Sequence, residues 1–169
     1  IIAPTRELVI QIYEDAKVLS EFTGLKMQVA FGGADYAKQR DAIISGVDVL
    51  IGTAGRLKDY YNQQVYTFYG LDCVVLDEAD RMFDLGFIDD IRYFFNSMPK
   101  PSERLNMLFS ATLSNRVKEL AYEHMNEPTH IHVAPDVITA GKIEEQLYYP
   151  SNSEKLPLLI GLMLRHTPF

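Results

Sequence analysis

Acidic and hydroxyl side chains occur in two short segments whose residue types suit the chemistry of a phosphate ester. Asp77-Glu78-Ala79-Asp80 and Ser110-Ala111-Thr112 each follow directly after a run of apolar residues. In proteins that hydrolyse nucleotides, an aspartate at the end of a buried strand holds Mg²⁺ through water, and a neighbouring carboxylate orients the attacking water. Asp77 is therefore a candidate Mg²⁺-binding residue and Glu78 a candidate water-positioning residue. On an extended chain these two side chains would point to opposite sides, which allows separate roles.

The same segments also have an interpretation that needs no ligand. The acidic tetrapeptide suits a solvated turn that caps the next helix, and the serine and threonine suit an ordinary helix entry. The distance between the segments separates the two interpretations. If both end adjacent parallel strands, we expect the Asp80 carboxylate within hydrogen-bond reach of the hydroxyl of Ser110, Thr112 or both, because a partly shielded carboxylate needs donors.

Three more segments place hydroxyl, glycine and arginine residues directly after apolar runs: Pro4-Thr5-Arg6-Glu7, Gly32-Gly33 and Thr53-Ala54-Gly55-Arg56. The first also suits a plain helix start with Thr5 as N-cap, and a pair of glycines by itself marks only a turn. Free backbone N–H groups and arginines at such positions bind phosphate. The three segments therefore suit the sugar-phosphate backbone of a nucleic acid.

The elements that must position these residues follow from the alternation of short apolar runs with segments of helical period. This alternation predicts βαβ units around a parallel sheet. We expect strands at residues 1–3, 27–31, 47–51, 73–76, 105–109 and 130–133. Helical stripes run from Leu8 to Leu19, from Ile88 to Phe95 and from Val117 to His124. Because ligands bind beyond the carboxyl ends of parallel strands, all five polar segments are expected along one edge of the sheet.

The domain organisation follows from the same pattern. We expect a partial domain at residues 1–134, a linker at 135–142 and the start of a second domain at 143–169. In the last part, Ile143 to Tyr149 alternates like a strand and Ser153 suits the N-cap of a final helix. The opening residues, Ile1-Ile2-Ala3, resemble the tail of a buried strand, so we expect a fragment of a longer protein.

Composition narrows the class of protein. Hydrophobic residues make up 47% of the 169 residues, enough to bury a core. The net charge of −7 argues against coating of nucleic acid by bulk positive potential, so any contact must be local. No apolar run is long enough for a bilayer, and we expect a cytoplasmic protein without membrane contact. The single cysteine, Cys73, is expected to be buried and inert, and His130 and His132 lack partners at metal-ligand spacing.

Taken in order, the five polar segments resemble the DEAD-box RNA helicases, and the resemblance extends from the first residue to about Val133. The segments at 75–82, 84–88 and 105–114 look most similar to a bacterial subgroup of that family. The resemblance implies an α/β fold of the P-loop NTPase type. This fold is a RecA-like open parallel sheet with helices on both faces, here lacking its N-terminal P-loop unit.

The resemblance also implies roles for single residues. The RNA backbone would be bound by Pro4, Thr5, Arg6, Gly33, Thr53, Gly55 and Arg56. Asp77 would hold the Mg²⁺ of ATP through water and Glu78 would position the hydrolytic water. Asp80 would pair with Ser110 and Thr112 and so link the nucleotide state to closure against a second RecA-like domain. The implied cofactors are ATP and Mg²⁺, and the implied partners are RNA, that second domain and RNA-decay or ribonucleoprotein components.

Two departures from the family pattern limit what the chain can do. The family usually has proline at the position of Ala54, which predicts a looser turn there. No Gly-x-x-x-x-Gly-Lys-[Ser/Thr] segment occurs in the sequence, so the backbone cradle for the ATP phosphates is missing. We therefore expect a helicase fragment that is inactive alone. The alternative is a stand-alone RNA-binding or scaffolding module, although the presence of Asp77 and Glu78 favours the fragment.

Overall fold

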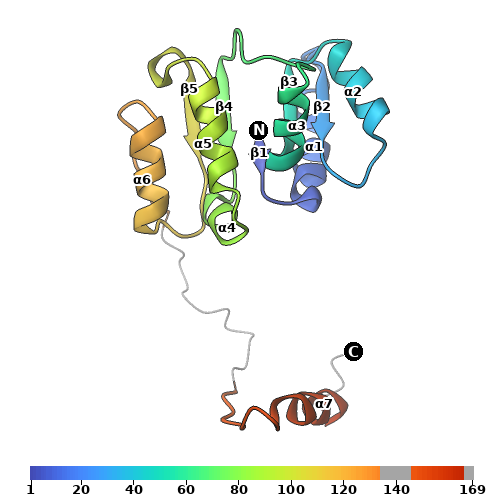
Figure 1. The fold of residues 1–169 in the computed structure, drawn as a ribbon, viewed down its shortest axis with the longest axis vertical. Coiled ribbons are helices and arrows are strands. Elements are labelled where there is room, and N and C mark those ends of the chain that lie inside the picture. Colours follow the sequence, from blue (N-terminus) through green and yellow to red (C-terminus); the bar gives the residue numbers. More distant parts are fainter. Residues whose placement is uncertain (134–145, 166–169) are drawn as a thin grey trace. The chain divides into compact units, whose positions relative to one another are not determined.

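The computed structural model describes residues 1–133 and 146–165, which divide into two compact units (Figure 1). Unit 1 comprises Ile1–Thr129, and unit 2 comprises His130–Phe169. The expected linker at 135–142 lies outside the described residues. The described part of unit 2 contains one helix, α7 (Lys155–Arg165). None of the helices in the described ranges is long and apolar enough to cross a membrane.

Unit 1 is built on a sheet of five parallel strands in the order β2-β3-β1-β4-β5. The strands are β1 (Ile2–Ala3), β2 (Met27–Ala30), β3 (Val49–Thr53), β4 (Cys73–Leu76) and β5 (Leu105–Leu108). Central strand β1 pairs with β3 on one side and β4 on the other, where Ile2 is in register with Gly52 and Leu76. Five of the seven expected strands are therefore confirmed, with ends shifted by at most two residues.

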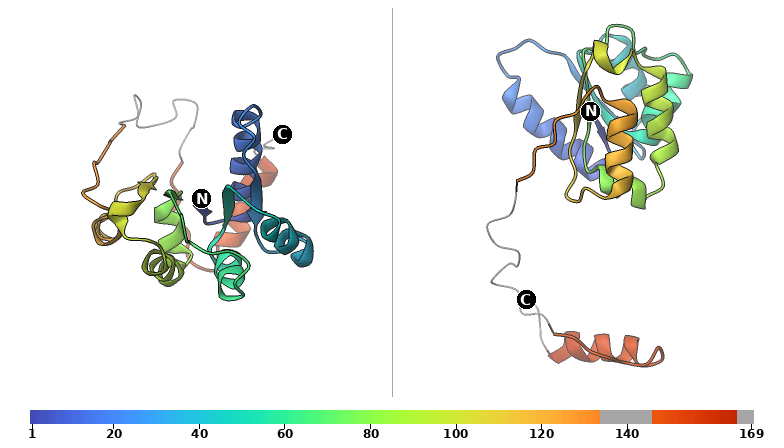
Figure 2. Two further views of the ribbon diagram at one scale, coloured as in Figure 1. Left: turned by 90° about the horizontal axis from the view of Figure 1, so that it is seen from above. Right: turned by 90° about the vertical axis from the view of Figure 1, so that its left-hand side faces the viewer.

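The helices cover both faces of this sheet, as predicted. The described helices of unit 1 are α1 (Arg6–Leu19), α2 (Tyr36–Ile44), α3 (Ala54–Asn62), α4 (Ala79–Asp84), α5 (Ile88–Ser97) and α6 (Asn115–His124), with a 3₁₀ turn at Pro101–Glu103. Helix α1 lies on one face, and α2, α3 and α5 lie on the other (Figure 2). The connection from β1 to β2 crosses the sheet in the opposite direction to the later connections. Because crossovers between parallel strands are right-handed, the helix of the first connection lies on one face and those of the later connections lie on the other.

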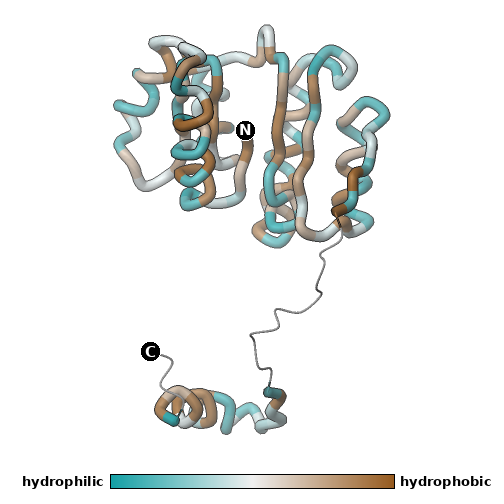
Figure 3. The backbone as a smooth tube through the Cα atoms, turned by 180° about the vertical axis from the view of Figure 1, so that it is seen from behind, coloured by the Kyte–Doolittle hydropathy of each residue, from teal (hydrophilic) through white to brown (hydrophobic). Residues whose placement is uncertain are grey.

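Two apolar cores hold the layers together. Under α1, the buried residues are Ala3, Val9, Phe31 and Ile51. The larger core lies on the other face and includes Tyr60, Met82, Ile91, Phe94, Val117 and Leu120. Figure 3 shows the hydrophobic residues concentrated in the strands and along one side of the helices. The predicted stripe of α1 is correct except at its end, since Leu19 is 84% exposed.

Two expected strands are wrong. Residues 130–133 form no strand, and Ile131 and Val133 are largely exposed. In the second case, residues 143–145 lie outside the described part of the chain and residues 146–149 are not in a strand. Period-two alternation supplies a suitable surface, but a strand also needs a neighbour for its backbone hydrogen bonds. The helix expected after Ser153 is present as α7, with Pro157 in its first turn, where a missing N–H is tolerated.

Candidate nucleotide and RNA site

All five predicted polar segments lie at the carboxyl ends of the strands, where each strand leads into a loop or helix. The strand order separates them into two groups. The segments with glycine and arginine follow β1, β2 and β3 in one half of the sheet, whereas the acidic and hydroxyl segments follow β4 and β5 in the other. We call these the arginine group and the carboxylate group.

Asp77 is fixed at the end of β4 by backbone contacts. Its N–H donates to the Ile2 carbonyl of β1 at 3.0 Å, and its Oδ1 accepts from the Glu78 N–H at 2.9 Å. Among the described residues, no hydrogen bond reaches the second carboxylate oxygen. A half-buried carboxylate with a free oxygen fits Mg²⁺, which keeps several waters and takes few protein ligands. The described part of the chain has no cluster of three acidic, histidine or cysteine side chains that would make a full protein cage.

Glu78 is not extended, contrary to the sequence expectation. It has φ 49° and ψ 52°, in the left-handed region, and it is the N-cap residue of α4. The chain passes from strand to helix within this one residue, and a left-handed residue makes that sharp turn. For a residue with a side chain this costs on the order of 1 kcal/mol. The Glu78 carboxylate is held 3.2 Å from the Arg81 guanidinium one turn further along α4.

The expected contact between Asp80 and the hydroxyl segment is confirmed. Oδ2 of Asp80 accepts from the Thr112 hydroxyl at 2.8 Å and from the Thr112 N–H at 2.9 Å. Burial raises the pKa of Asp80, but these bonds, together with the nearby Ser110 hydroxyl and the Arg81 N–H, outweigh it and hold the pKa below its usual value. Asp80 also accepts from the Arg81 N–H at 3.0 Å. Helix α4 begins at Ala79 with Glu78 as its N-cap residue, so Asp80 lies in the first turn and is not the cap.

Ser110 joins the two loops through its hydroxyl. The hydroxyl accepts from the Asp80 N–H at 3.2 Å and donates to the Thr112 carbonyl at 2.7 Å. A backbone bond from the Ala79 N–H to the Phe109 carbonyl, 3.0 Å long, adds to this connection. A displacement of either loop would therefore be transmitted to the other through several bonds.

In the arginine group, Thr5 is the N-cap of α1, as predicted, and its hydroxyl accepts from the Leu8 N–H at 3.3 Å. Pro4, before it, is buried, whereas Arg6 is exposed. The Arg6 guanidinium donates to the Gly33 carbonyl at 3.2 Å and lies 5.1 Å from the centre of the Phe31 ring. Gly33 has φ 76°, and a Cβ there would come within 2.9 Å of the Arg6 side chain. The positive φ favours glycine, whereas the close contact alone could be relieved by movement of the Arg6 side chain.

Arg56 lies in the first turn of α3, which follows β3 directly. Thr53 ends β3 and its side chain makes no capping bond, while Gly55 is exposed with open space around it. Ala54 is buried and begins α3, so the looser turn expected from the missing proline is not seen. The Arg56 guanidinium packs against the rings of Tyr36 and Tyr60, at 4.7 and 5.4 Å from their centres.

Sequence reasoning missed two residues that shape the arginine group. Gln39, buried on α2, accepts from the Phe31 N–H at 2.9 Å and donates to the Phe31 carbonyl at 3.2 Å. This bond pair replaces a strand partner at the end of β2 and fixes the start of the Gly32-Gly33 turn. Gly52 in β3 would place a Cβ 2.6 Å from the Ala30 carbonyl. A glycine inside a strand pattern was the available signal for that close approach.

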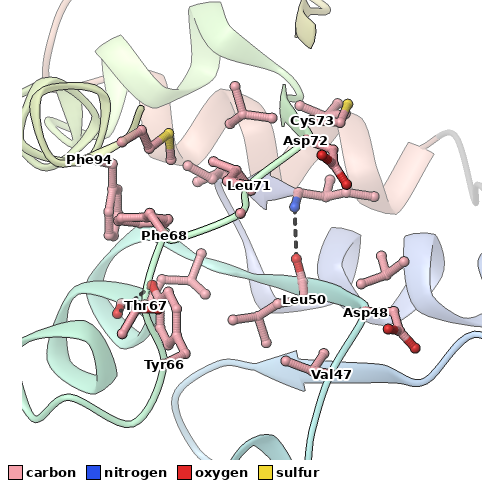
Figure 4. A pocket seen from close by; sticks show the side chains of 18 of the residues that line it. Val47, Asp48, Leu50, Tyr66, Thr67, Phe68, Leu71, Asp72, Cys73 and Phe94 are labelled. Atoms are coloured by element: carbon pink, nitrogen blue, oxygen red, sulfur yellow. Dashed lines mark hydrogen bonds between the residues drawn. The ribbon is translucent and has the colours of Figure 1, made fainter. Parts of the chain in front are cut away.

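A cavity of about 420 Å³ lies at the opposite end of the sheet, where the strands begin (Figure 4). Its walls include Leu50, Phe68, Leu71 and Cys73, and it contains no predicted site residue. Cys73 is half-buried there, whereas a buried thiol was expected. The backbone nitrogen of Ile1 donates to the Leu50 carbonyl at 2.7 Å beside this cavity. The cavity is thus separate from the candidate site.

Two of the tyrosines away from Arg56 serve packing. Tyr61 and Tyr66 stack around Phe68 against the larger core, whereas Tyr69 is exposed. The rings of His130 and His132 lie 6.2 Å apart and belong to no metal-binding cluster of the described residues.

Comparison with known proteins finds relatives that match nearly the whole chain. The sequence model described as "DEAD/DEAH box helicase" matches residues 1–120. The chain is 57% identical over 168 residues to the ATP-dependent RNA helicase RhlB of Pseudoalteromonas atlantica, covering 99% of this chain and 40% of that protein. It is equally similar, at 57%, to RhlB of Vibrio cholerae, of which it covers 38%. The chain therefore spans about 40% of the length of these relatives.

Solved structures support the fold. A DEAD box protein from Methanococcus jannaschii aligns with a TM-score of 0.70 at 31% identity, covering 75% of this chain and 34% of that one. A hypothetical ATP-dependent RNA helicase from Sulfolobus tokodaii aligns with a TM-score of 0.69 at 30% identity, covering 75% and 37%. The RecA-like sheet inferred from the sequence is the fold of these structures.

Proposed function

Because the chain belongs to the DEAD/DEAH box helicase family, we propose that it is the part of an ATP-dependent RNA helicase that supplies the hydrolytic carboxylates and the RNA-backbone contacts of the first RecA-like domain. The observation that carries this proposal is the Asp80–Thr112 contact, which ties the acidic loop to the hydroxyl loop. Such a link lets the occupancy of a nucleotide site change the position of a neighbouring loop, as coupling of ATP use to RNA unwinding requires.

In this proposal each carboxylate has one role. Asp77 would hold Mg²⁺ through water, and the metal would neutralise charge on the phosphates when bound. Glu78, clamped beside Arg81, would accept a hydrogen bond from the attacking water and orient it. Asp80, Ser110 and Thr112 would keep the two loops in register with a second RecA-like domain.

We further propose that the chain alone does not hydrolyse ATP. Catalysis of phosphoryl transfer depends on positioning and charge stabilisation, and no phosphate-cradling Gly-x-x-x-x-Gly-Lys-[Ser/Thr] segment occurs in the 169 residues. The arginine group would contribute RNA contacts that do not read the bases.

A chimeric enzyme tests the proposal. The matching 168 residues of an RhlB relative would be replaced by this chain, and RNA-stimulated phosphate release would be measured. The chimera is expected to hydrolyse ATP, and Glu78→Gln within it should lower the rate by about 10²-fold or more. The isolated chain should release no phosphate above its own Glu78→Gln control. A folded chimera that is inactive, or an isolated chain that is active, would refute the corresponding part of the proposal.

A further inference from the structure

We propose that Tyr36 is a positioning residue for Arg56, whose guanidinium it holds in the orientation that meets the RNA backbone. This inference rests on the proposed function, because it assigns a role within the same RNA-binding surface. Tyr36 is the first residue of α2, three residues after Gly33, and Arg56 lies in the first turn of α3. The contact therefore joins two of the segments predicted to bind RNA.

The geometry is that of a cation held between two aromatic rings. The guanidinium carbon of Arg56 lies 4.7 Å from the centre of the Tyr36 ring and 5.4 Å from that of Tyr60. The Arg56 Nη1 also donates to the Tyr60 hydroxyl at 3.3 Å. Ring quadrupoles attract a cation at these distances. The guanidinium is thus fixed in direction as well as in place.

The two rings are themselves immobilised. Tyr60 is fully buried, and its hydroxyl donates to the Tyr36 carbonyl at 2.9 Å. The Tyr36 hydroxyl accepts from the side-chain amide of Gln63 at 2.5 Å. The rings lie 4.9 Å apart at 52° to each other. An arginine held by fixed rings loses less side-chain entropy when it binds a ligand than a free one does.

The charge of Arg56 stays available because the rings do not neutralise it. Within the described residues, Arg56 forms no ion pair, whereas Arg81 and Arg92 are paired with glutamates. Arg6 shares this arrangement, since it lies over Phe31 and bonds only to a backbone carbonyl in the described part of the chain. Both arginines expected to bind RNA are therefore oriented by aromatic rings and remain free to pair with a phosphate.

Tyr36 is the ring of this cluster that can be substituted without creating a cavity in the core. Tyr60 is a fully buried core residue, so its truncation would disturb the fold. Tyr36 is half-buried at the rim of the site. Tyr36→Phe retains the ring and loses the bond to Gln63, while Tyr36→Leu removes the ring that faces Arg56.

The experiment is a double-mutant cycle on RNA affinity. Binding of a fluorescent single-stranded RNA at low salt would be measured for the full chain, Tyr36→Leu, Tyr36→Phe, Arg56→Ala and the double variant Tyr36→Leu/Arg56→Ala. Tyr36→Leu is expected to weaken binding about two- to five-fold, the loss of one cation–π contact. Tyr36→Phe should match the unmodified chain, and Tyr36→Leu should have no further effect once Arg56 is alanine. Tyr122→Leu, at an exposed tyrosine of α6, is the matched control and should change nothing.

The outcomes distinguish this inference from the proposed function. If Arg56→Ala leaves RNA affinity unchanged, the proposed RNA-binding surface is wrong. If Arg56→Ala weakens binding but Tyr36→Leu does not, or Tyr36→Leu weakens it equally in both backgrounds, only the positioning role of Tyr36 is refuted.

A second measurement needs no RNA. The Arg56 side-chain protons should show upfield NMR shifts from the Tyr36 ring that persist in Tyr36→Phe and shrink in Tyr36→Leu. Arg56 protons without such shifts in the unmodified chain would also refute the positioning role.

Discussion

Asp80 joins two loops of the carboxylate group through its side chain and backbone. Its Oδ2 accepts both the hydroxyl and the N–H of Thr112, and its own N–H donates to Ser110. Hydrogen bonds to an ionised carboxylate favour the charged form, which explains why the pKa of Asp80 lies below its usual value despite partial burial. The loop contact is therefore stronger when Asp80 is ionised.

Removal of the Thr112 hydroxyl should raise the pKa of Asp80. Thr112→Val keeps the side-chain shape but deletes the 2.8 Å bond, whereas Thr112→Ser retains a hydroxyl. We expect the Asp80 carboxyl carbon to titrate at higher pH in Thr112→Val than in the unmodified chain or in Thr112→Ser. An NMR pH titration measures this directly. The same change at exposed Thr129 is the control, and an unchanged Asp80 titration in Thr112→Val would contradict the assigned contact.

The sign of the accompanying stability effect follows from linkage. The folded-state pKa of Asp80 is lowered, so its contribution to the free energy of unfolding is complete above the ordinary pKa of about 4 and is lost as the pH falls through the folded value. Part of this acid sensitivity should disappear in Thr112→Val. At pH 7 the same variant should be slightly less stable.

At the scale of elements, α6 attaches to α5 through a ring stack. The rings of Phe95 and His124 lie 4.8 Å apart at 15°, and Glu123 reaches Arg92 on the facing helix at 3.4 Å. Burial is the largest influence on His124 and lowers its pKa, while Glu123 opposes this shift. The His124 Nε2 is buried and has no hydrogen-bond partner among the described residues, and the Glu123 carboxylate 3.7 Å away only partly offsets the cost of burying a proton there.

The docking of α6 should therefore weaken in mild acid. Because the folded pKa of His124 lies below the ordinary 6.5, the unfolded chain binds the proton more readily. The free energy of unfolding should fall as the pH drops from about 7 through 6.5 toward the pKa of His124 in the folded state. His124→Phe should remove this part of the pH dependence, as measured by melting temperatures at pH 7.5 and 5.5. His132→Phe, in an exposed segment, is the control. If the melting temperature falls between pH 7.5 and pH 5.5 by the same amount in His124→Phe as in the unmodified chain, the assignment to His124 is refuted.

At the scale of the whole molecule, the arginines expected to bind RNA belong to a protein with a net charge of −7. The sheet order collects Arg6 and Arg56 in one half of the edge and the carboxylates in the other. An acidic protein gains little from long-range attraction to RNA, so binding must come from a few direct contacts.

RNA binding by the chain should accordingly be weak, sensitive to salt and indifferent to base sequence. If two arginines supply the phosphate contacts, the slope of log affinity against log salt should be about −1.4 for single-stranded RNA, since each contact contributes about −0.7. Titrations of poly-uridine and poly-adenine at several salt concentrations would measure both properties. A much steeper slope would reveal further cationic contacts, and a strong preference for one sequence would contradict backbone recognition.

The sequence alone was sufficient for the strand and helix alternation, for the placement of five polar segments at strand ends and for the Asp80 contact. These features depend on local signals, such as apolar period, the N-cap residue Thr5 and ordered motifs. The family resemblance rested on the same local segments. The roles assigned to the RNA-binding residues remain predictions.

The tertiary structure decided what depends on contacts between distant residues. Tyr60 donates to the Tyr36 carbonyl 24 residues away, and this pairing requires α2 and α3 to lie side by side on one face of the sheet. The left-handed backbone of Glu78 arises because β4 must turn at once into α4. Residues 130–133 have a strand-like alternation but no partner strand, so they stay outside the sheet. Local periodicity specifies which surface a segment presents, whereas the order of the strands determines which other segment that surface meets.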